Sequence, residues 1–195
     1  MFQRIKGIMR LDVNTFEEVE ADEGATMQAA IIVTVVALLA GVGALIGARA
    51  ANSAAGQLDQ LGIEMPITLP QFSPAGAFVN AVVGVFVAWL LWSVLTYFIG
   101  TRLFGGKSSI NEMLRVLGYA QSPNLLRVFS FIPCLGPILG LVGAIWSIVT
   151  GFIGVRQGLD LDNTKALLTI VASWLVSFLV NWLLLGPIFA RLLAA

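Results

Sequence analysis

The chain has 195 residues, of which 58% are hydrophobic and only 11% are charged, and its net charge is zero. Ordinary globular domains are about 25% charged, so this composition excludes a soluble domain and predicts an integral membrane protein. With no histidine and one cysteine, Cys134, the chain offers neither the usual general base nor a multi-cysteine metal site. We therefore expect no enzyme activity, no cofactor or metal, and no nucleic-acid partner.

Residues 1–25 are predicted to form a separate cytoplasmic segment that begins with a short amphipathic helix. The residues on its apolar face are Phe2, Ile5, Ile8 and Met9. The flanking cations are Arg4, Lys6 and Arg10. Such a helix lies in the membrane interface, with its cations near anionic headgroups.

An acidic stretch follows this helix. Thr15 and Glu18 have capping-box spacing, which predicts that a second short helix begins there. The acidic residues are Glu17, Glu18, Glu20, Asp22 and Glu23. The stretch is either a solvated helix leading into the membrane or a docking surface for a basic protein partner.

Five membrane spans are predicted over residues 26–195, giving an all-α bundle. A span needs about 20 apolar residues. The uncharged runs of this length are 26–48, 76–100, 135–155 and 166–190. The third segment, 112–133, is long enough but carries Arg115, Pro123 and Arg127, so we expect a helix kinked near Pro123. The alternative is a re-entrant hairpin with the segment that follows. The connection Arg49–Ala75 is expected to be extended.

Five spans place most of the basic residues on one side. The residues on that side are Arg4, Lys6, Arg10, Arg102, Lys107, Arg115, Arg156 and Lys165. Those on the other are Arg49, Arg127 and Arg191. Because cytoplasmic loops are rich in Lys and Arg, we expect a cytoplasmic N-terminus and a C-terminus outside. A four-span chain would have its C-terminus inside.

Polar groups inside the spans suggest few functional sites. The four clear spans lack ionisable residues, which disfavours an ion-coupled transporter. Arg115 can pair with Glu112 or extend to the headgroups. Arg127 can also extend to the headgroups, or it can bind a lipid phosphate or a partner's carboxylate. A polar cavity joining Arg127 to Asn80, Asn124 or Asn181 would favour transport.

Small and aromatic residues in the spans predict close packing. The small-residue pairs at spacing four are Gly43–Gly47, Gly136–Gly140 and Ser147–Gly151, and they favour tight contacts within the fold or between copies. The tryptophans inside the apolar runs are Trp89, Trp92, Trp146 and Trp174. They indicate interhelical packing or a groove for a sterol or lipid.

The order of motifs resembles the Yip/YIPF family of multispanning membrane proteins, whose eukaryotic members interact with Rab GTPases. The resemblance is carried by Gly118, Tyr119 and Pro123 in LRVLGYAQSPNLL, by FIPCLGPILGLVGAIWSIVTGFIGVRQ with Trp146 and Arg156, and by LDLDNTKALL. The acidic lead-in FEEVEADEGATMQAAIIV is similar to that of prokaryotic members. The family implies five spans with a cytoplasmic N-terminus. The chain lacks the long N-terminal region of eukaryotic members, which implies a compact member in a prokaryotic cytoplasmic membrane.

These features favour a non-enzymatic scaffold or adaptor that organises the membrane or takes part in trafficking-like processes. The candidate functional residues are Gly118, Tyr119, Pro123, Asn124 and Arg127, and the candidate membrane-surface contacts are Arg4, Lys6 and Arg10. The expected partners are membrane lipids, a protein at the N-terminal segment and further copies of the chain. The alternatives are a transport protein or channel subunit for lipids or small solutes, and an accessory subunit of a larger membrane complex.

Overall fold

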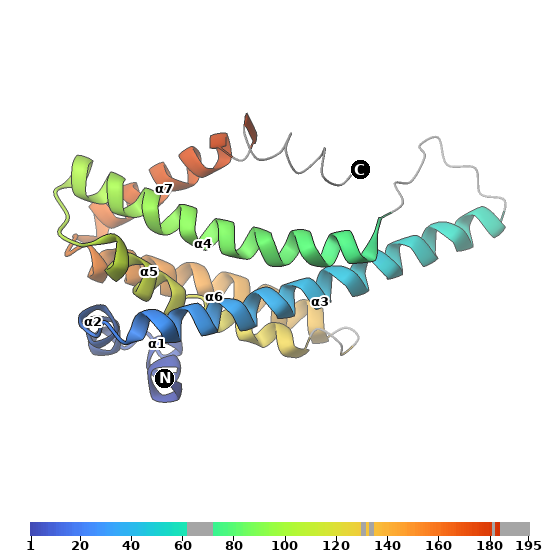
Figure 1. The fold of residues 1–195 in the computed structure, drawn as a ribbon, viewed down its shortest axis with the longest axis horizontal. Helices are drawn as coiled ribbons and strands as arrows, with labels where there is room; N and C mark the ends of the chain where they lie inside the picture. The colour runs from blue at the N-terminus through green and yellow to red at the C-terminus, as the bar shows by residue number, and fades with distance from the viewer. Residues whose placement is uncertain (62–71, 130–131, 133–134, 181, 184–195) are drawn as a thin grey trace.

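The structure, a computed structural model, describes residues 1–61, 72–129, 132, 135–180 and 182–183 (Figure 1). Within these residues the chain forms seven α-helices and one 3-10 helix, η1. They are α1 (Phe2–Met9), α2 (Val13–Ala21), α3 (Ala25–Gln60), α4 (Pro74–Phe104), α5 (Ile110–Tyr119), η1 (Ser122–Phe129), α6 (Leu135–Gly158) and α7 (Asn163–Val180). The long helices α3 and α4 lie side by side along the long axis, and α1 and α2 lie near one end (Figure 1).

Four of these helices, α3, α4, α6 and α7, are long and apolar enough to cross a membrane. They contain the predicted runs 26–48, 76–100 and 135–155, and residues 166–180 of the fourth, so these runs are confirmed as apolar helices. Residues 181 and 184–190 of the fourth run, and with them Asn181, lie outside the described residues.

The third predicted segment is interrupted. Its α-helix ends at Tyr119, and η1 begins at Ser122. Pro123 has no N–H and its ring would clash with the carbonyl group of Tyr119 in a continuous α-helix, so the helix cannot pass through this point. Ser122 Oγ instead donates a hydrogen bond to that carbonyl oxygen at 2.6 Å. A single kinked helix over 112–133 is therefore wrong, because the segment is an α-helix followed by a 3-10 helix.

The first long helix continues beyond its apolar run. The expectation of an extended connection from Arg49 is wrong for residues 49–60, which are helical, and residues 62–71 lie outside the described part. This part of α3 is rich in alanine, the residue with the highest helix propensity. Asn52 Nδ2 donates to the Phe72 carbonyl oxygen at 2.8 Å, and Phe72 N donates to Asn52 Oδ1 at 3.0 Å. The amide thus fixes the chain entering α4 beside α3.

Three segments distant in sequence meet at one end of the bundle, which we call the hairpin end: α1–α2, the α4–α5 connection and the α6–α7 turn. Lys107 N donates to the Leu159 carbonyl oxygen at 3.0 Å, which joins the α4–α5 connection to the α6–α7 turn. Gln157 Nε2 donates to Glu17 Oε1 at 3.2 Å, joining α6 to α2. The charge count assigned these same segments to one side of the membrane.

Glycines allow the helices to approach closely. A Cβ on Gly118 of α5 would lie 2.7 Å from the Ala29 Cβ of α3, and one on Gly151 of α6 would lie 2.7 Å from the Trp92 ring of α4. The Ser147–Gly151 spacing therefore does mark a tight contact within the fold. Around Gly43 and Gly47 no neighbour lies within 4 Å of an added Cβ. Contact between copies through that pair stays a prediction.

Candidate functional site: the N-terminal hairpin and its binding seat

Helices α1 and α2 form a hairpin that packs on the bundle. Ile8 of α1 and Phe16 and Val19 of α2 are fully buried in a core cluster that also contains Val116 and Tyr119 of α5. Gly7 allows the two helices to touch, because a Cβ there would lie only 2.2 Å from Thr15 Oγ1. The hairpin therefore packs into the same core cluster as α5 of the bundle.

The start of α2 differs from the prediction. Asp12 is its N-cap, with Oδ1 accepting a hydrogen bond from Asn14 N at 3.3 Å. Thr15 lies inside the helix and donates to Asp12 Oδ2 at 2.7 Å, so the predicted Thr15–Glu18 capping box is wrong. The Glu18 carboxylate instead binds Arg4.

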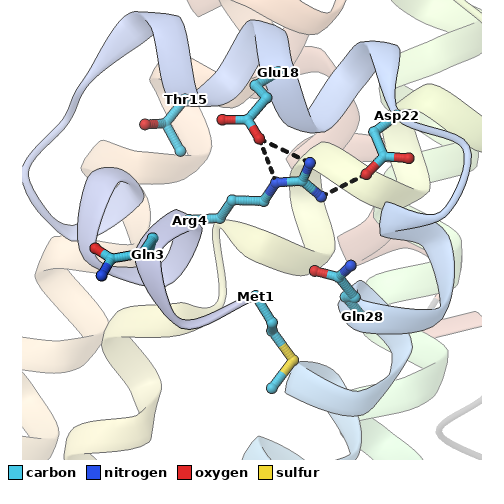
Figure 2. A pocket seen from close by; sticks show the side chains of 7 residues that line it. All are labelled: Met1, Gln3, Arg4, Thr15, Glu18, Asp22 and Gln28. Carbon is cyan, nitrogen blue, oxygen red and sulfur yellow. Dashed lines mark hydrogen bonds and ion pairs between the residues drawn. The ribbon is translucent and has the colours of Figure 1, made fainter.

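Arg4 connects α1 to two positions on α2 (Figure 2). Its Nη2 lies 2.8 Å from Glu18 Oε1, and its Nη1 lies 2.6 Å from Asp22 Oδ2. The hydrogen bonds to Asp22 and Glu18 raise the pKa of Arg4, and the bond from Arg4 lowers that of Asp22. The Arg4 side chain is only 17% exposed. Of the three cations predicted to contact lipid, Lys6 and Arg10 are the exposed ones.

A cavity of about 410 Å³ surrounds this ion-pair cluster, and its lining includes Gln28 of α3. Gln28 Oε1 also accepts a hydrogen bond from the hydroxyl group of Tyr119, which is fully buried. The neighbouring Gly118 lies against α3 and the Trp89 indole. Tyr119, predicted as functional from the third segment, is therefore part of the seat on which the hairpin rests, and Gly118 beside it lets α5 pack closely on α3.

Arg115 has a structural role at the end of α2. The side chain is 5% exposed, and its Nη2 donates to the Glu20 carbonyl oxygen. The last carbonyls of a helix lack intrahelical partners and attract cations, so Arg115 caps α2. Glu112 accepts a hydrogen bond from Ser109 N at 2.8 Å, completing a capping box at the start of α5. The predicted Glu112–Arg115 pair is wrong because the N–H of the N-cap residue Ser109 and the Ser108 hydroxyl bind the carboxylate.

Carboxylates from three elements line one cavity of about 410 Å³ at the hairpin end, which we call the acidic groove. Its residues are Glu17, Glu20, Ala21, Lys107, Ser108, Ser109, Glu112 and Asp160. Burial, followed by the charges of Asp160 and Glu112, raises the pKa of Glu20 to about 7. Within the described residues, no group of acidic side chains converges closely enough to hold a metal ion.

A second cavity of about 350 Å³ shares Ser109 and Glu112 with the acidic groove. It is lined also by Glu23 and Thr26, where the chain enters α3, and by the buried Arg115. The polar surface therefore continues along the start of α5.

The remaining predicted site residues lie in η1, away from the acidic groove. The Pro123 carbonyl group packs against Gly143 of α6, where an added Cβ would lie 2.7 Å from its oxygen. Asn124 is 6% exposed and donates through Nδ2 to Gln121 Oε1 at 2.8 Å. Asn124 Oδ1 and Arg127 Nε are buried and have no hydrogen-bond partner among the described residues. The predicted site thus divides into two parts.

Two of the tryptophans fit interhelical packing. Trp89 is 7% exposed, and its Nε1 donates to the Leu114 carbonyl oxygen at 3.1 Å, while Trp92 packs on α6. Trp146 instead donates from Nε1 to the Met9 carbonyl oxygen at 2.9 Å and so fixes the end of α1. Trp174 is 47% exposed.

Sequence reasoning missed the residues that attach the hairpin to the bundle. The Ser109-x-x-Glu112 spacing is a capping-box signal and could have located the start of α5. No local pattern could have paired Gln28 with Tyr119 or Met9 with Trp146, because these contacts join residues 91 and 137 positions apart.

Comparison with known proteins identifies one family. No curated protein and no solved structure matches the chain. The family model described as the Yip1 domain matches residues 6–185. The match begins within α1 and includes the whole of α2 to α7, so the hairpin and its seat lie in the same family domain as the apolar helices. The chain is a polytopic integral membrane protein that belongs to the Yip1 family.

Proposed function

We propose that this Yip1-family protein is a non-enzymatic membrane scaffold that binds a basic protein segment in the acidic groove. The observation that carries the proposal is the convergence of Glu17, Glu20, Glu112 and Asp160 from three elements on one cavity. Lys107 is the cation among the residues that line it. A Lys- and Arg-rich segment has the charge that this surface attracts.

The groove is held in place before any partner arrives. Phe16 and Val19 anchor α2 in the core, and Arg115 fixes its last turn. The backbone bond from Lys107 to Leu159 connects the α4–α5 connection to the α6–α7 turn, and both line the groove. A preformed surface loses less entropy on binding than a flexible acidic tail, which supports a docking role.

Burial is the largest cause of the raised pKa of Glu20, and the second cause is the repulsion between carboxylates that would also attract a basic partner. Asp160 and Glu112 repel the Glu20 carboxylate, and Arg115 offsets this only in part. A partner's ammonium or guanidinium group in the groove would stabilise the ionised carboxylates. Binding should therefore release a fraction of a proton near neutral pH.

The scaffold would cross the membrane five times, with its N-terminus in the cytoplasm and its C-terminus outside, in a prokaryotic cytoplasmic membrane. The interrupted segment α5–η1 has ten α-helical and eight 3-10 residues. At about 1.5 and 2.0 Å per residue it extends about 31 Å, close to the thickness of the hydrocarbon core. The basic segments that meet at the hairpin end support its cytoplasmic placement. Labelling of single cysteines introduced at both ends of α4, in sealed vesicles, tests the orientation.

A charge reversal with a matched control tests the groove. Glu17→Lys changes an exposed carboxylate in the groove, and Asp59→Lys makes the same change near the far end of α3. The probe is a ten-residue Lys- and Arg-containing peptide, titrated against the full chain in nanodiscs. We expect Glu17→Lys to weaken binding by about tenfold or more and Asp59→Lys to leave it near wild type. Equal affinity in all three chains would exclude the groove as the docking site. A natural partner that survives gentle-detergent purification would make the chain an accessory subunit.

Transport is a second candidate, and the buried atoms without partners in η1 favour it. Asn124 Oδ1 and Arg127 Nε lie in the interrupted third segment, where polar groups near the membrane interior attract solutes or headgroups. Liposome flux and lipid-scrambling assays on the wild type and on Arg127→Ala test this function. Flux that Arg127→Ala abolishes supports it, and the absence of flux in the wild type rules it out.

A further inference from the structure

We propose that the outward face of α1 and its C-cap, formed by Phe2, Lys6 and the C-cap residue Arg10, is a binding surface for anionic lipid headgroups. The surface belongs to α1 alone and is separate from the acidic groove, which α1 does not line. Its occupant is the anionic surface of the membrane that the chain spans.

The three residues share one face of the helix. They follow one another at intervals of four positions, which places them on one stripe of an α-helix. Phe2 is 76% exposed, and Lys6 and Arg10 are exposed. The opposite face holds Ile8, which is fully buried in the core. The structure therefore divides the predicted apolar face: Ile8 packs against protein, and Phe2 points outward beside the cations.

The position of α1 places this face beside the membrane. The end of α1 is bound to Trp146, which lies near the middle of α6. At about 1.5 Å per residue, Trp146 is about 17 Å from the start of α6 and about 18 Å from its end. On either side of it Ile145 and Ile148 of α6 are 54% and 50% exposed, as expected of a lipid-facing helix. The bond from Gln157 to Glu17 holds the following helix, α2, at the hairpin end. The hairpin therefore holds α1 against the lipid-facing side of the bundle, between the middle of α6 and the hairpin end, and long cationic side chains at this level extend to the headgroups.

The charges on α1 fit an anionic surface. The carboxylates of Glu18 and Asp22 are bound to Arg4, and that of Asp12 accepts hydrogen bonds from the start of α2. In the part of the chain that the structure describes, neither Lys6 nor Arg10 takes part in an ion pair. Cations on an interfacial helix bind anionic headgroups, and an aromatic side chain beside them inserts at the acyl boundary.

Lipid quenching at α1 tests this surface in the full chain. A fluorophore is attached at position 3 of the Gln3→Cys, Cys134→Ser chain, which is reconstituted singly in nanodiscs of phosphatidylcholine and phosphatidylglycerol. One lipid or the other carries brominated acyl chains that quench the fluorophore. We expect brominated phosphatidylglycerol to quench more strongly at equal mole fraction, because two cations give up to about thirtyfold local enrichment.

The matched variants change two charges each. Lys6→Gln with Arg10→Gln should make quenching by the two brominated lipids nearly equal, whereas Arg49→Gln with Arg102→Gln should preserve the difference. Near-ultraviolet circular dichroism checks that each variant keeps its fold. Equal quenching by both lipids in the unsubstituted chain overturns the proposal. Loss of the quenching difference between the two lipids in both double variants also overturns the proposal. A fluorophore that is shielded from lipid only when two chains occupy one disc overturns it too, because the occupant of the surface would then be a second copy of the chain.

Discussion

Replacing Glu20 with glutamine should remove a pH dependence from the attachment of α2 to the bundle. Burial and the charges of Asp160 and Glu112 raise the pKa of Glu20 to about 7, from a usual value of 4.5. A carboxyl group whose pKa is higher in the attached state binds its proton more tightly there. Attachment is therefore strongest below pH 4.5 and weakens as the pH rises towards about 7.

The size of this effect follows from the pKa difference and from the exposure of the group. The difference between about 7 and 4.5 corresponds to at most about 3 kcal/mol. Because Glu20 is only half-buried, solvent screening reduces this to about 1 kcal/mol, or about a fivefold change in the attachment equilibrium. The charged groups around Glu20 are Glu17 of α2, Glu112 and Arg115 of α5, Asp160 of the α6–α7 turn and Lys107 of the α4–α5 connection.

Hydrogen exchange of the α2 amides, corrected for the intrinsic rate at each pH, measures this equilibrium. Wild-type protection should fall about fivefold between pH 4.5 and 8. Glu20→Gln should show nearly the same protection at both values. The lowered pKa of Asp22 acts in the opposite sense, but its effect lies below the usual value of 3.8 and so outside this range. Equal wild-type protection at pH 4.5 and 8, or the same loss in Glu20→Gln, would refute the reasoning.

Three further substitutions test the seat and the hairpin. Gly118→Ala places a Cβ at 2.7 Å from a neighbouring side chain and should lower stability by about 1–3 kcal/mol, measured by thermal unfolding in detergent. Gly84→Ala is the control and should leave stability unchanged, because no neighbour lies within 4 Å of the added Cβ. Arg4→Gln removes two ion pairs and should loosen α1 by about 1–2 kcal/mol, seen as faster amide exchange in α1 alone; unchanged exchange would mean that the ion pairs add nothing. Trp146→Phe loses one hydrogen bond and should increase proteolysis of the N-terminal segment by about fivefold, while Trp174→Phe, at an exposed position, should leave it unchanged.

The long apolar helices could be predicted from the sequence because their signal is local. Each run of uncharged residues is long enough to cross the hydrocarbon, and no tertiary contact is needed to recognise it. The ends were less certain, since α3 continues past Arg49 on residues whose helix propensity is high but whose hydropathy is low. Pro123 correctly marked the weak point of the third segment, although its effect is a complete break and not a kink.

The site was harder to predict because it depends on competition between partners. Spacing alone paired Glu112 with Arg115, but the N–H of the N-cap residue Ser109 binds Glu112, and the Glu20 carbonyl at the end of α2 binds Arg115. Arg4 looked equivalent to Lys6 in the sequence. Its position on the face next to α2 decides that it binds Glu18 and not solvent.

The hydrogen bond between Met9 and Trp146 also has a consequence for biosynthesis. The two residues are 137 positions apart, so the first helix to leave the ribosome cannot dock until α6 has been made. At about 5–20 residues per second, this delay is about 7 to 27 seconds. Arg4 can bind Glu18 and Asp22 as soon as α2 has been made, but Trp146 can hold the end of α1 against the bundle only after most of the chain has entered the membrane. A docked hairpin is therefore a sign that α6 has been made and inserted.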